Sequence, residues 1–110
     1  MEAFRSFLED RQGLLSLGAW AAWEGEKFIG VLASRREGSH ICLCFVREDF
    51  HRQGIGRSLW ERFLAETCAK RITVHSSPHA VGFYHRLGFL DTAEEQQQDG
   101  IRFTPMEYTR

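Results

Sequence analysis

The sequence predicts a mixed α/β fold of the α+β type, in which a mostly antiparallel sheet carries helices on both faces. Three observations predict it. Short strand-like segments are separated by hairpin-length turns, two amphipathic segments show apolar residues at helical spacing, and the chain has 110 residues. This length suits one small core, so we expect residues 1–110 to form a single domain.

Composition narrows the function classes. Apolar residues make up 43% of the chain and its net charge is −1, unlike a nucleic-acid binder that works by bulk charge. No apolar run reaches membrane-spanning length, and the first residues lack a signal-peptide core. Three cysteines without paired spacing suit free thiols in a reducing compartment. We therefore expect a cytoplasmic protein with no nucleic-acid or membrane partner.

The first half of the chain is expected to hold one helix and an antiparallel meander. Apolar residues at helical spacing predict a helix over residues 2–12; they are Phe4, Phe7 and Leu8. Three strand-like segments follow, at residues 19–23, 27–34 and 40–46. The turns between these segments are of hairpin length, which predicts that the strands pair as antiparallel neighbours.

The second half alternates helices and strands. The expected elements are a helix at 54–69, a strand at 71–76, a helix at 78–87 and a hairpin of strands at 89–97 and 101–108. Ser77 and Pro78 suit the start of the second helix, and Gly88 suits its left-handed end. The polar run 94–99 is expected to be an exposed strand edge that turns at Asp99-Gly100.

A basic, glycine-bearing turn leads from the strand that ends at Val46 into a helix. The turn and the first helical residues read Arg52-Gln53-Gly54-Ile55-Gly56-Arg57. Glycines let the backbone come close to a ligand, and the N–H groups at a helix N-terminus bind anions. The pattern predicts a site for a phosphate-bearing ligand at 52–57. An ordinary turn that uses glycine for its backbone freedom is the alternative.

Three blocks in this order resemble the GCN5-related N-acetyltransferase (GNAT) superfamily, whose members transfer acetyl from acetyl-CoA to an amine. The glycine turn, with its lead-in Val46-x-x-x-Phe50, is similar to the pyrophosphate loop of that family. Residues 74–89, with their Phe-Tyr pair and Gly-Phe end, resemble its strand–helix segment. Residues 100–108 are similar to the last strand of many bacterial members.

The chain departs from the family pattern in two respects. His51 stands where the family usually has Gln or Arg, and Glu48 stands where it often has proline; neither change removes a backbone N–H from the loop. The family also usually opens with a strand and a helix before the helix expected at 2–12. The resemblance therefore implies a short bacterial-type member with a truncated N-terminus that lacks this first strand and helix.

The resemblance implies residues that bind acetyl-CoA. Backbone amides of the glycine turn, with a basic side chain beside them, would bind the pyrophosphate of CoA. Phe45 and Val46 lie where the family splays one strand from its neighbour at a bulge, so that exposed backbone accepts the pantetheine arm. The whole set is Phe45, Val46, His51, Arg52, Gln53, Gly54, Ile55, Gly56, Arg57 and Ser58.

The resemblance also places Tyr84 where a phenol protonates the departing CoA thiolate, so Tyr84 is the predicted catalytic residue. We expect Tyr84 to project toward the cofactor cleft and Phe83 to pack the helix against the sheet. The alternative is that both aromatic side chains serve packing. The general base, which must take a proton from an ammonium acceptor, stays open between Glu48, His40, His75 and a chain of water molecules.

The cysteines and histidines have simpler interpretations. Cys42 and Cys44 alternate on one strand, so we expect both to face the same side, as small core residues rather than as nucleophiles. Cys68 is expected on the first long helix, facing the sheet. His75 and His79 straddle a Ser-Pro turn, so the sequence predicts no metal site.

Two functions follow from these predictions. The first is an N-acetyltransferase that moves acetyl from acetyl-CoA to a primary amine, on a small molecule or a protein, by direct transfer in a ternary complex. The alternative is a non-catalytic acyl-CoA-binding sensor or assembly module that has lost its acceptor pocket. A truncated sheet would expose a strand edge, so we also expect a homodimer.

Overall fold

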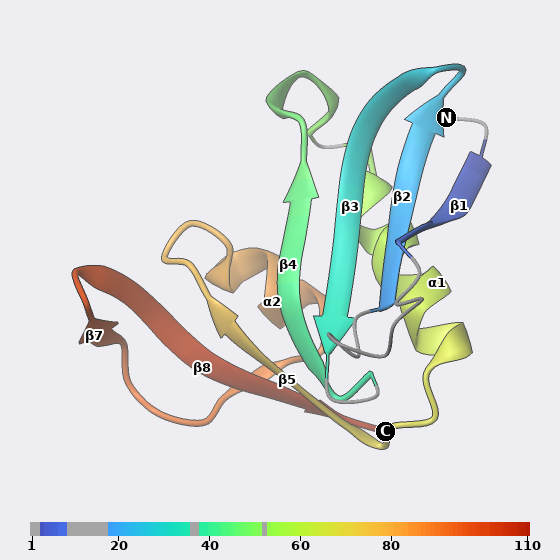
Figure 1. The fold of residues 1–110 in the computed structure, drawn as a ribbon. Helices are drawn as coiled ribbons and strands as arrows, with labels where there is room; N and C mark the ends of the chain where they lie inside the picture. Colours follow the sequence, from blue (N-terminus) through green and yellow to red (C-terminus); the bar gives the residue numbers. More distant parts are fainter. Residues whose placement is uncertain (1–2, 9–17, 36–37, 52) are drawn as a thin grey trace.

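The structure is a computed structural model that describes residues 3–8, 18–35, 38–51 and 53–110. Its elements are β1 (Ala3–Leu8), β2 (Gly18–Glu24), β3 (Lys27–Arg35), β4 (His40–Val46), the 3-10 turn η1 (Glu48–Phe50), α1 (Ile55–Glu66), β5 (Arg71–Ser76), α2 (Val81–Leu87), β6 (Leu90–Asp91), β7 (Gln96–Gln98) and β8 (Ile101–Thr109). Within these residues the strands lie in the order β1-β2-β3-β4-β5-β8-β6, and β7 pairs with β8 (Figure 1).

The sheet is mixed and mostly antiparallel. β2, β3 and β4 form the predicted meander, and β5 pairs antiparallel with β8 along its whole length. The pairing of β4 with β5 is parallel, because α1 carries the chain from the end of one strand back to the start of the other. These observations confirm the predicted mixed α/β class.

The helix predicted over residues 2–12 is wrong. Residues 3–8 form β1, which pairs antiparallel with β2 from Ala3 opposite Trp23 to Leu8 opposite Ala19; residues 9–12 lie outside the described residues. A few apolar positions in so short a segment fit either a helix or a strand. Pairing with β2 favours the strand because it satisfies the backbone groups of both segments, and local sequence does not report that pairing.

The larger hydrophobic core lies between the sheet and the two helices. Its buried members on the helices are Ile55, Leu59, Trp60, Phe63, Tyr84 and Leu87. Rings join the helices to the chain that follows them, since Phe89 lies 5.1 Å from Trp60 and 5.2 Å from Tyr84 between ring centroids. Helices were expected on both faces of the sheet. Instead, α1 and α2 contribute to the same core, on one face of the sheet, and both lie behind the strands in Figure 1.

A bulge in β4 changes the side to which its residues point. Ala33 on β3 pairs with Leu43 and Ser34 pairs with Ile41, so Cys42 is an extra residue. Cys42 therefore packs with the small cluster on the outer face, while Cys44 packs against the larger core. The expectation that the two cysteines face the same side is wrong, because the bulge interrupts the alternation of the strand.

The helices are shorter than predicted, whereas two strands have the predicted bounds. β4 and β5 occupy 40–46 and 71–76 as expected, but α1 ends at Glu66, where Thr67 adopts an extended conformation. Cys68 is therefore exposed beyond the helix, and its predicted place on a helix facing the sheet is wrong. The guanidinium of Arg110 donates hydrogen bonds to carbonyls at this helix end, which stabilises the early stop.

The C-terminal part follows the sequence prediction with one break. The segment predicted as one strand at 89–97 forms two short strands, β6 and β7. The predicted turn at Asp99-Gly100 is confirmed, and both residues have positive φ, 53° and 80°, as a type I′ hairpin turn requires. β7 is exposed throughout, as expected of the polar run.

Candidate active site

The site begins where β4 and β5 part. Their parallel pairing consists of His40 opposite Thr73 and Ile41 opposite Val74, although β4 continues to Val46 and β5 to Ser76. The two strands diverge toward their carboxyl ends, as Figure 1 shows. The resemblance predicted a splay at a bulge at Phe45 and Val46. These residues lie beyond the last pair of β4 with β5, but the bulge is at Cys42, in the pairing with β3.

A cleft of about 620 Å³ opens beside the diverging end of β4. The end of β4, the turn at 50–57 and helix α2 together form its walls. The lining residues are Cys44, Phe45, Val46, Phe50, His51, Gly54, Ile55, Gly56, Arg57, His79, Ala80, Phe83, Arg86 and Leu87. Most of its lining residues are therefore apolar, and its basic residues are His51 and Arg57 of the turn and helix start, His79 just before α2, and Arg86 of α2.

The N-terminus of α1 contributes backbone donors to the cleft. Gly54 is the N-cap residue, in the left-handed conformation with φ +78°, and its carbonyl accepts the first helical bond from Ser58 N–H at 3.0 Å. The N–H groups of the first turn, at residues 55–57, have no carbonyl partner within a helix. No acidic residue stands in this turn. Amide donors and the helix dipole therefore favour an anion here.

The two glycines of the turn serve different purposes. Gly54 supplies a left-handed backbone in open space, where no atom lies within 4 Å of an added Cβ. At Gly56 an added Cβ would lie 2.9 Å from Cε1 of Phe83. Gly56 therefore lets α2 approach the start of α1, and the Phe83 ring becomes a wall of the cleft.

Most of the predicted cofactor-binding set gathers at this cleft. The members that line it are Phe45, Val46, His51, Gly54, Ile55, Gly56 and Arg57. Gln53 is exposed and Ser58 half-buried, and neither is among the lining residues. Arg52 lies outside the described residues.

Sequence reasoning missed the contribution of α2. His79 and Ala80, just before α2, and Phe83, Arg86 and Leu87 of α2 line the cleft. Phe83 was expected to pack the helix against the sheet and instead reaches the cleft. The sequence feature closest to an indication of this wall is the pair of glycines, because the Phe83 ring leaves no room for a side chain at Gly56.

Polar contacts hold the rim of the cleft. Arg57 Nη2 donates a hydrogen bond of 2.9 Å to the carbonyl of Arg86, which links the two helices at the basic side. His51 Nε2 lies 2.8 Å from the carbonyl oxygen of Val46, so the imidazole fixes the turn to the end of β4. Lys27 lies 5.0 Å from the ring centroid of Phe50, another lining residue.

Tyr84 lies beneath the cleft rather than in its wall. The residue is 5% exposed, is absent from the lining residues, and packs edge-on against the rings of Phe83 and Phe89. Its neighbour Cys44 does line the cleft. Burial raises the pKa of the Tyr84 phenol well above its ordinary value, and the neighbouring Cys44 raises it further.

Cys44 is poorly suited to act as a nucleophile. Burial raises the pKa of its thiol to about 11, although the hydrogen bond from Tyr84 opposes this shift. A nucleophilic cysteine needs the thiolate near neutral pH, and this environment disfavours the thiolate. Cys42 donates a hydrogen bond of 3.4 Å to the carbonyl of Ala33. Both cysteines therefore fit the interpretation as small packing residues.

The three side chains considered as general base lie at different places. Glu48 is exposed in η1, beyond the end of β4. His40 and His75 lie near the start of the divergence, with ring centroids 5.3 Å apart. Among the residues that the structure describes, no group of three or more His, Cys, Asp or Glu side chains could hold a metal ion. No described helix is long and apolar enough to cross a membrane.

Comparison with protein families identifies the family of this fold. A family model described as an acetyltransferase (GNAT) domain matches residues 3–110. The chain belongs to the GNAT acetyltransferase family. This GNAT chain has no match among curated proteins. The resemblance seen in the sequence is thus confirmed, and acyl transfer is the general activity that the family indicates.

Solved structures of the GNAT fold superpose on the chain. A GCN5-related N-acetyltransferase of Rhodopseudomonas palustris gives a TM-score of 0.73 at 19% identity, over 86% of this chain and 62% of that protein. A Bacillus subtilis acetyltransferase solved with CoA gives 0.66 at 20% identity, over 86% and 78%. Arabidopsis thaliana Naa50, solved with the bisubstrate analogue CoA-Ac-MVNAL, gives 0.69 at 18%, over 84% and 74%. The chain thus spans less than two thirds of the Rhodopseudomonas protein.

The raised pKa of Tyr84 predicts a loss of stability in alkali. The native fold keeps this phenol protonated at pH values where the unfolded chain ionises it, so stability is complete below the ordinary tyrosine pKa of 10. The free energy of unfolding should then fall as pH rises above 10, and Tyr84→Phe should reduce that fall. Urea unfolding at a series of pH values measures both.

The chain holds two tyrosines, so Tyr108→Phe is the matched control. Tyr108 lies in the same core, 5.6 Å from Phe89 between ring centroids, and does not line the cleft. The alkaline fall should persist in this variant. Equal pH dependence in the wild-type protein and in Tyr84→Phe would contradict the prediction.

Proposed function

We propose that this protein transfers acetyl from acetyl-CoA to a primary amine by direct transfer in a ternary complex, as one domain over residues 1–110. The observation that carries the proposal is the cleft itself. Backbone donors at the start of α1, the diverging end of β4 and a protonated phenol beneath them lie within one small region. The family match supports acyl transfer in general, and the finer assignment rests on these residues.

The donor set of the turn fits a diphosphate. Amides of the first helical turn supply several N–H donors without a carboxylate nearby, and Arg57 and Arg86 add positive charge. We propose that the predicted set from His51 to Ser58, including Arg52, binds the pyrophosphate of CoA. Phe45 and Val46, on the free end of β4, would present backbone to the pantetheine arm.

Tyr84 is the proposed general acid. A general acid must hold its proton until the leaving group needs it, and burial keeps this phenol protonated at neutral pH. Its phenol already neighbours a sulfur atom, that of Cys44 on the cleft wall. The phenol would give its proton to the CoA sulfur as the carbon–sulfur bond breaks. The burial of Tyr84 also fits a packing role, and Tyr84→Phe distinguishes the two roles.

A non-catalytic acyl-CoA-binding module is the second candidate function. One observation favours it: Tyr84 is not among the residues that line the cleft. Such a module would bind CoA and release none of it in the presence of amines. The likenesses to solved structures are all of the fold, so the acceptor stays open between small-molecule and protein amines.

We propose a homodimer with no nucleic-acid or membrane partner, in the cytoplasm. The net charge of −1 and the exposed apolar residues Leu90 and Ile101 near the C-terminal hairpin support it. Light scattering at micromolar concentration should give about twice the chain mass of 12.8 kDa. A mass of one chain would contradict the dimer and leave the transferase assignment unaffected.

Binding of CoA tests the proposed anion site. Arg57→Ala should weaken CoA binding about tenfold, because a hydrogen bond to a charged group is worth about 1.5 kcal/mol. Isothermal titration calorimetry measures the dissociation constant. Lys70→Ala, which removes a positive charge near the start of β5 and away from the cleft, is the control and should bind CoA like the wild-type protein. Wild-type protein that does not bind CoA would overturn the proposed function.

Release of free CoA tests the proposed acid. Tyr84→Phe should lower kcat about a hundredfold for productive amines, since a positioned general acid contributes about two to four powers of ten. CoA binding should stay within about twofold, because the phenol acts on the leaving group. Free thiol release from acetyl-CoA, measured with a panel of amines, gives the rate.

Tyr108→Phe is again the matched control and should retain the wild-type rate. Equal rates in the two variants would remove the acid role from Tyr84. If the wild-type protein binds CoA but releases no free CoA from acetyl-CoA with any amine, the non-catalytic module is favoured.

A further inference from the structure

His75 stands at the point where β4 and β5 separate. The last pair of their ladder joins Ile41 to Val74, and His75 is the next residue on β5. The opening between the two strands therefore begins beside this imidazole. The far end of β4, at Val46, lies about 17 Å from Ile41 at the rise of an extended strand, and Glu48 comes after that end.

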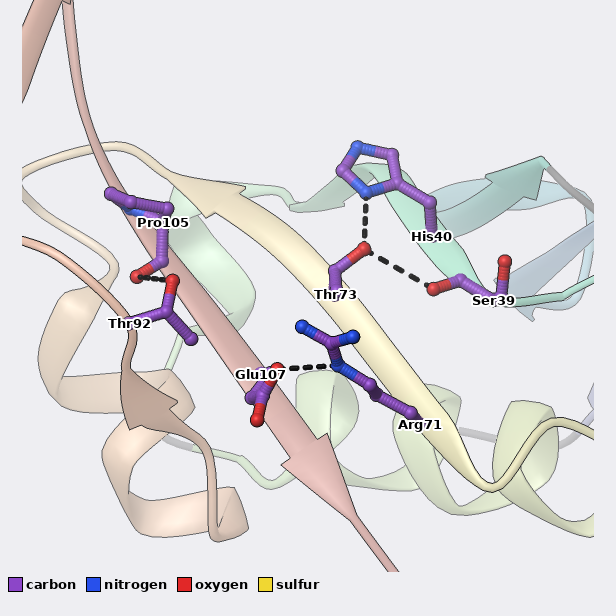
Figure 2. Close-up of polar contacts among 7 residues, drawn as sticks. All are labelled: Ser39, His40, Arg71, Thr73, Thr92, Pro105 and Glu107. Carbon is purple, nitrogen blue, oxygen red and sulfur yellow. Dashed lines mark hydrogen bonds and ion pairs between the residues drawn. The ribbon is translucent and has the colours of Figure 1, made fainter.

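His75 and Tyr84 lie on opposite faces of the sheet. Ile72 and Val74 of β5 are buried against the helices, so the alternation of the strand puts Thr73 and His75 on the outer face. Figure 2 shows the outer face at Thr73, with the helices behind the strands. Tyr84 and Cys44 belong to the helix side. An acceptor that reaches the opening from the outer face would meet His75 first.

Two rings set the orientation of the His75 imidazole. The ring stacks on Phe103 of β8, with centroids 4.6 Å apart and planes 26° apart. The ring of His40 meets it edge-on, with centroids 5.3 Å apart and planes 78° apart. Among the described residues, the ring contacts of His75 are those with Phe103 and His40. His75 itself is exposed to solvent. The imidazole is therefore held in place while the residue stays exposed.

A hydrogen-bond chain holds the imidazole of His40. The Thr73 hydroxyl lies 3.3 Å from the carbonyl oxygen of Ser39. The same hydroxyl lies 2.7 Å from Nδ1 of His40, as Figure 2 shows. This chain links the start of β4 to β5 directly beside the point of separation. His40 is thus a positioning residue for His75.

The other charged or titratable groups near His75 on the outer face are few in the described chain. Arg71 of β5 and Glu107 of β8 pair with each other, as Figure 2 shows, and Cys42 of β4 packs with the outer small cluster. His40 is the titratable neighbour that contacts the His75 ring.

We propose that His75 is the general base of the transfer, an inference that rests on the proposed function. An imidazole nitrogen of His75 takes one proton from the acceptor ammonium, and the freed lone pair forms the nitrogen–carbon bond to the acetyl carbonyl. The carbon–sulfur bond then breaks, and Tyr84 gives its proton to the sulfur. The second proton that leaves the nitrogen restores the phenol, so the net products are the amide, CoA thiol and one proton held by His75.

The first experiment replaces the base and varies the acceptor. His75→Gln should lower kcat/KM about a hundredfold for an alkylamine, which is an ammonium at neutral pH, since general base catalysis contributes at least about this much. An acyl hydrazide acceptor is already neutral and needs no deprotonation before attack, so the loss should shrink to about threefold or less. His85→Gln, which changes an exposed histidine of α2 outside the cleft, should retain wild-type rates with both acceptors.

The pH profile separates a base from a structural residue. With the alkylamine, the defect of His75→Gln should diminish as pH rises, because solution then supplies neutral amine. CoA affinity should stay within about twofold of the wild-type value. His75→Ala should regain activity on addition of imidazole, which supplies the missing base and serves as the second variant if Gln disturbs the sheet.

Three results would overturn the proposal while leaving the acetyltransferase function intact. These are wild-type rates in His75→Gln, an equal loss with both acceptors at every pH, and absence of rescue by imidazole. A wild-type protein that binds no CoA or acetylates no amine would instead overturn the proposed function itself. The two failures are therefore distinguishable in the same assays.

Discussion

The short parallel pairing of β4 with β5 is the constraint on which the rest of the site depends. Two residue pairs join these strands before they diverge, and both strands run on past the last pair. Each helix follows the diverging end of one strand, α1 after β4 and α2 after β5. The same separation therefore opens the sheet and brings two helix starts to the opening, which is why backbone donors, apolar walls and basic side chains meet there.

Close approach of the two helices then determines the shape of the cleft. Gly56 gives the Phe83 ring its place against the start of α1, and the side chain of Arg57 reaches the carbonyl of Arg86 across the gap. An added methyl group at Gly56 would push that ring into the cleft or move α2 away. The second glycine of the turn is therefore explained by packing against Phe83 as fully as by ligand binding. Both explanations require a residue without a side chain at position 56.

Local pattern was sufficient where one segment determines its own structure. The bounds of β4 and β5 and the turn at Asp99-Gly100 followed from apolar runs and turn chemistry. Pairing with a distant segment was not predictable, so residues 3–8 were expected to be helical. The bulge at Cys42 could not be read from alternation, because an extra residue reverses the alternation itself. The site was predicted along the glycine turn and missed along α2, whose approach depends on a contact between elements.

The two faces of the sheet provide the two environments that an acid and a base need. A phenol keeps its proton at neutral pH when burial disfavours the phenolate, and Tyr84 has that burial on the helix side. A base that collects a proton from a solvated ammonium must remain accessible, and His75 is exposed on the outer side. If both groups lay on one face, their demands for burial and exposure would conflict. In the proposed mechanism, placing them across the separation of β4 and β5 removes that conflict, because the carbonyl of a bound acetyl group would be reached from both sides of one opening.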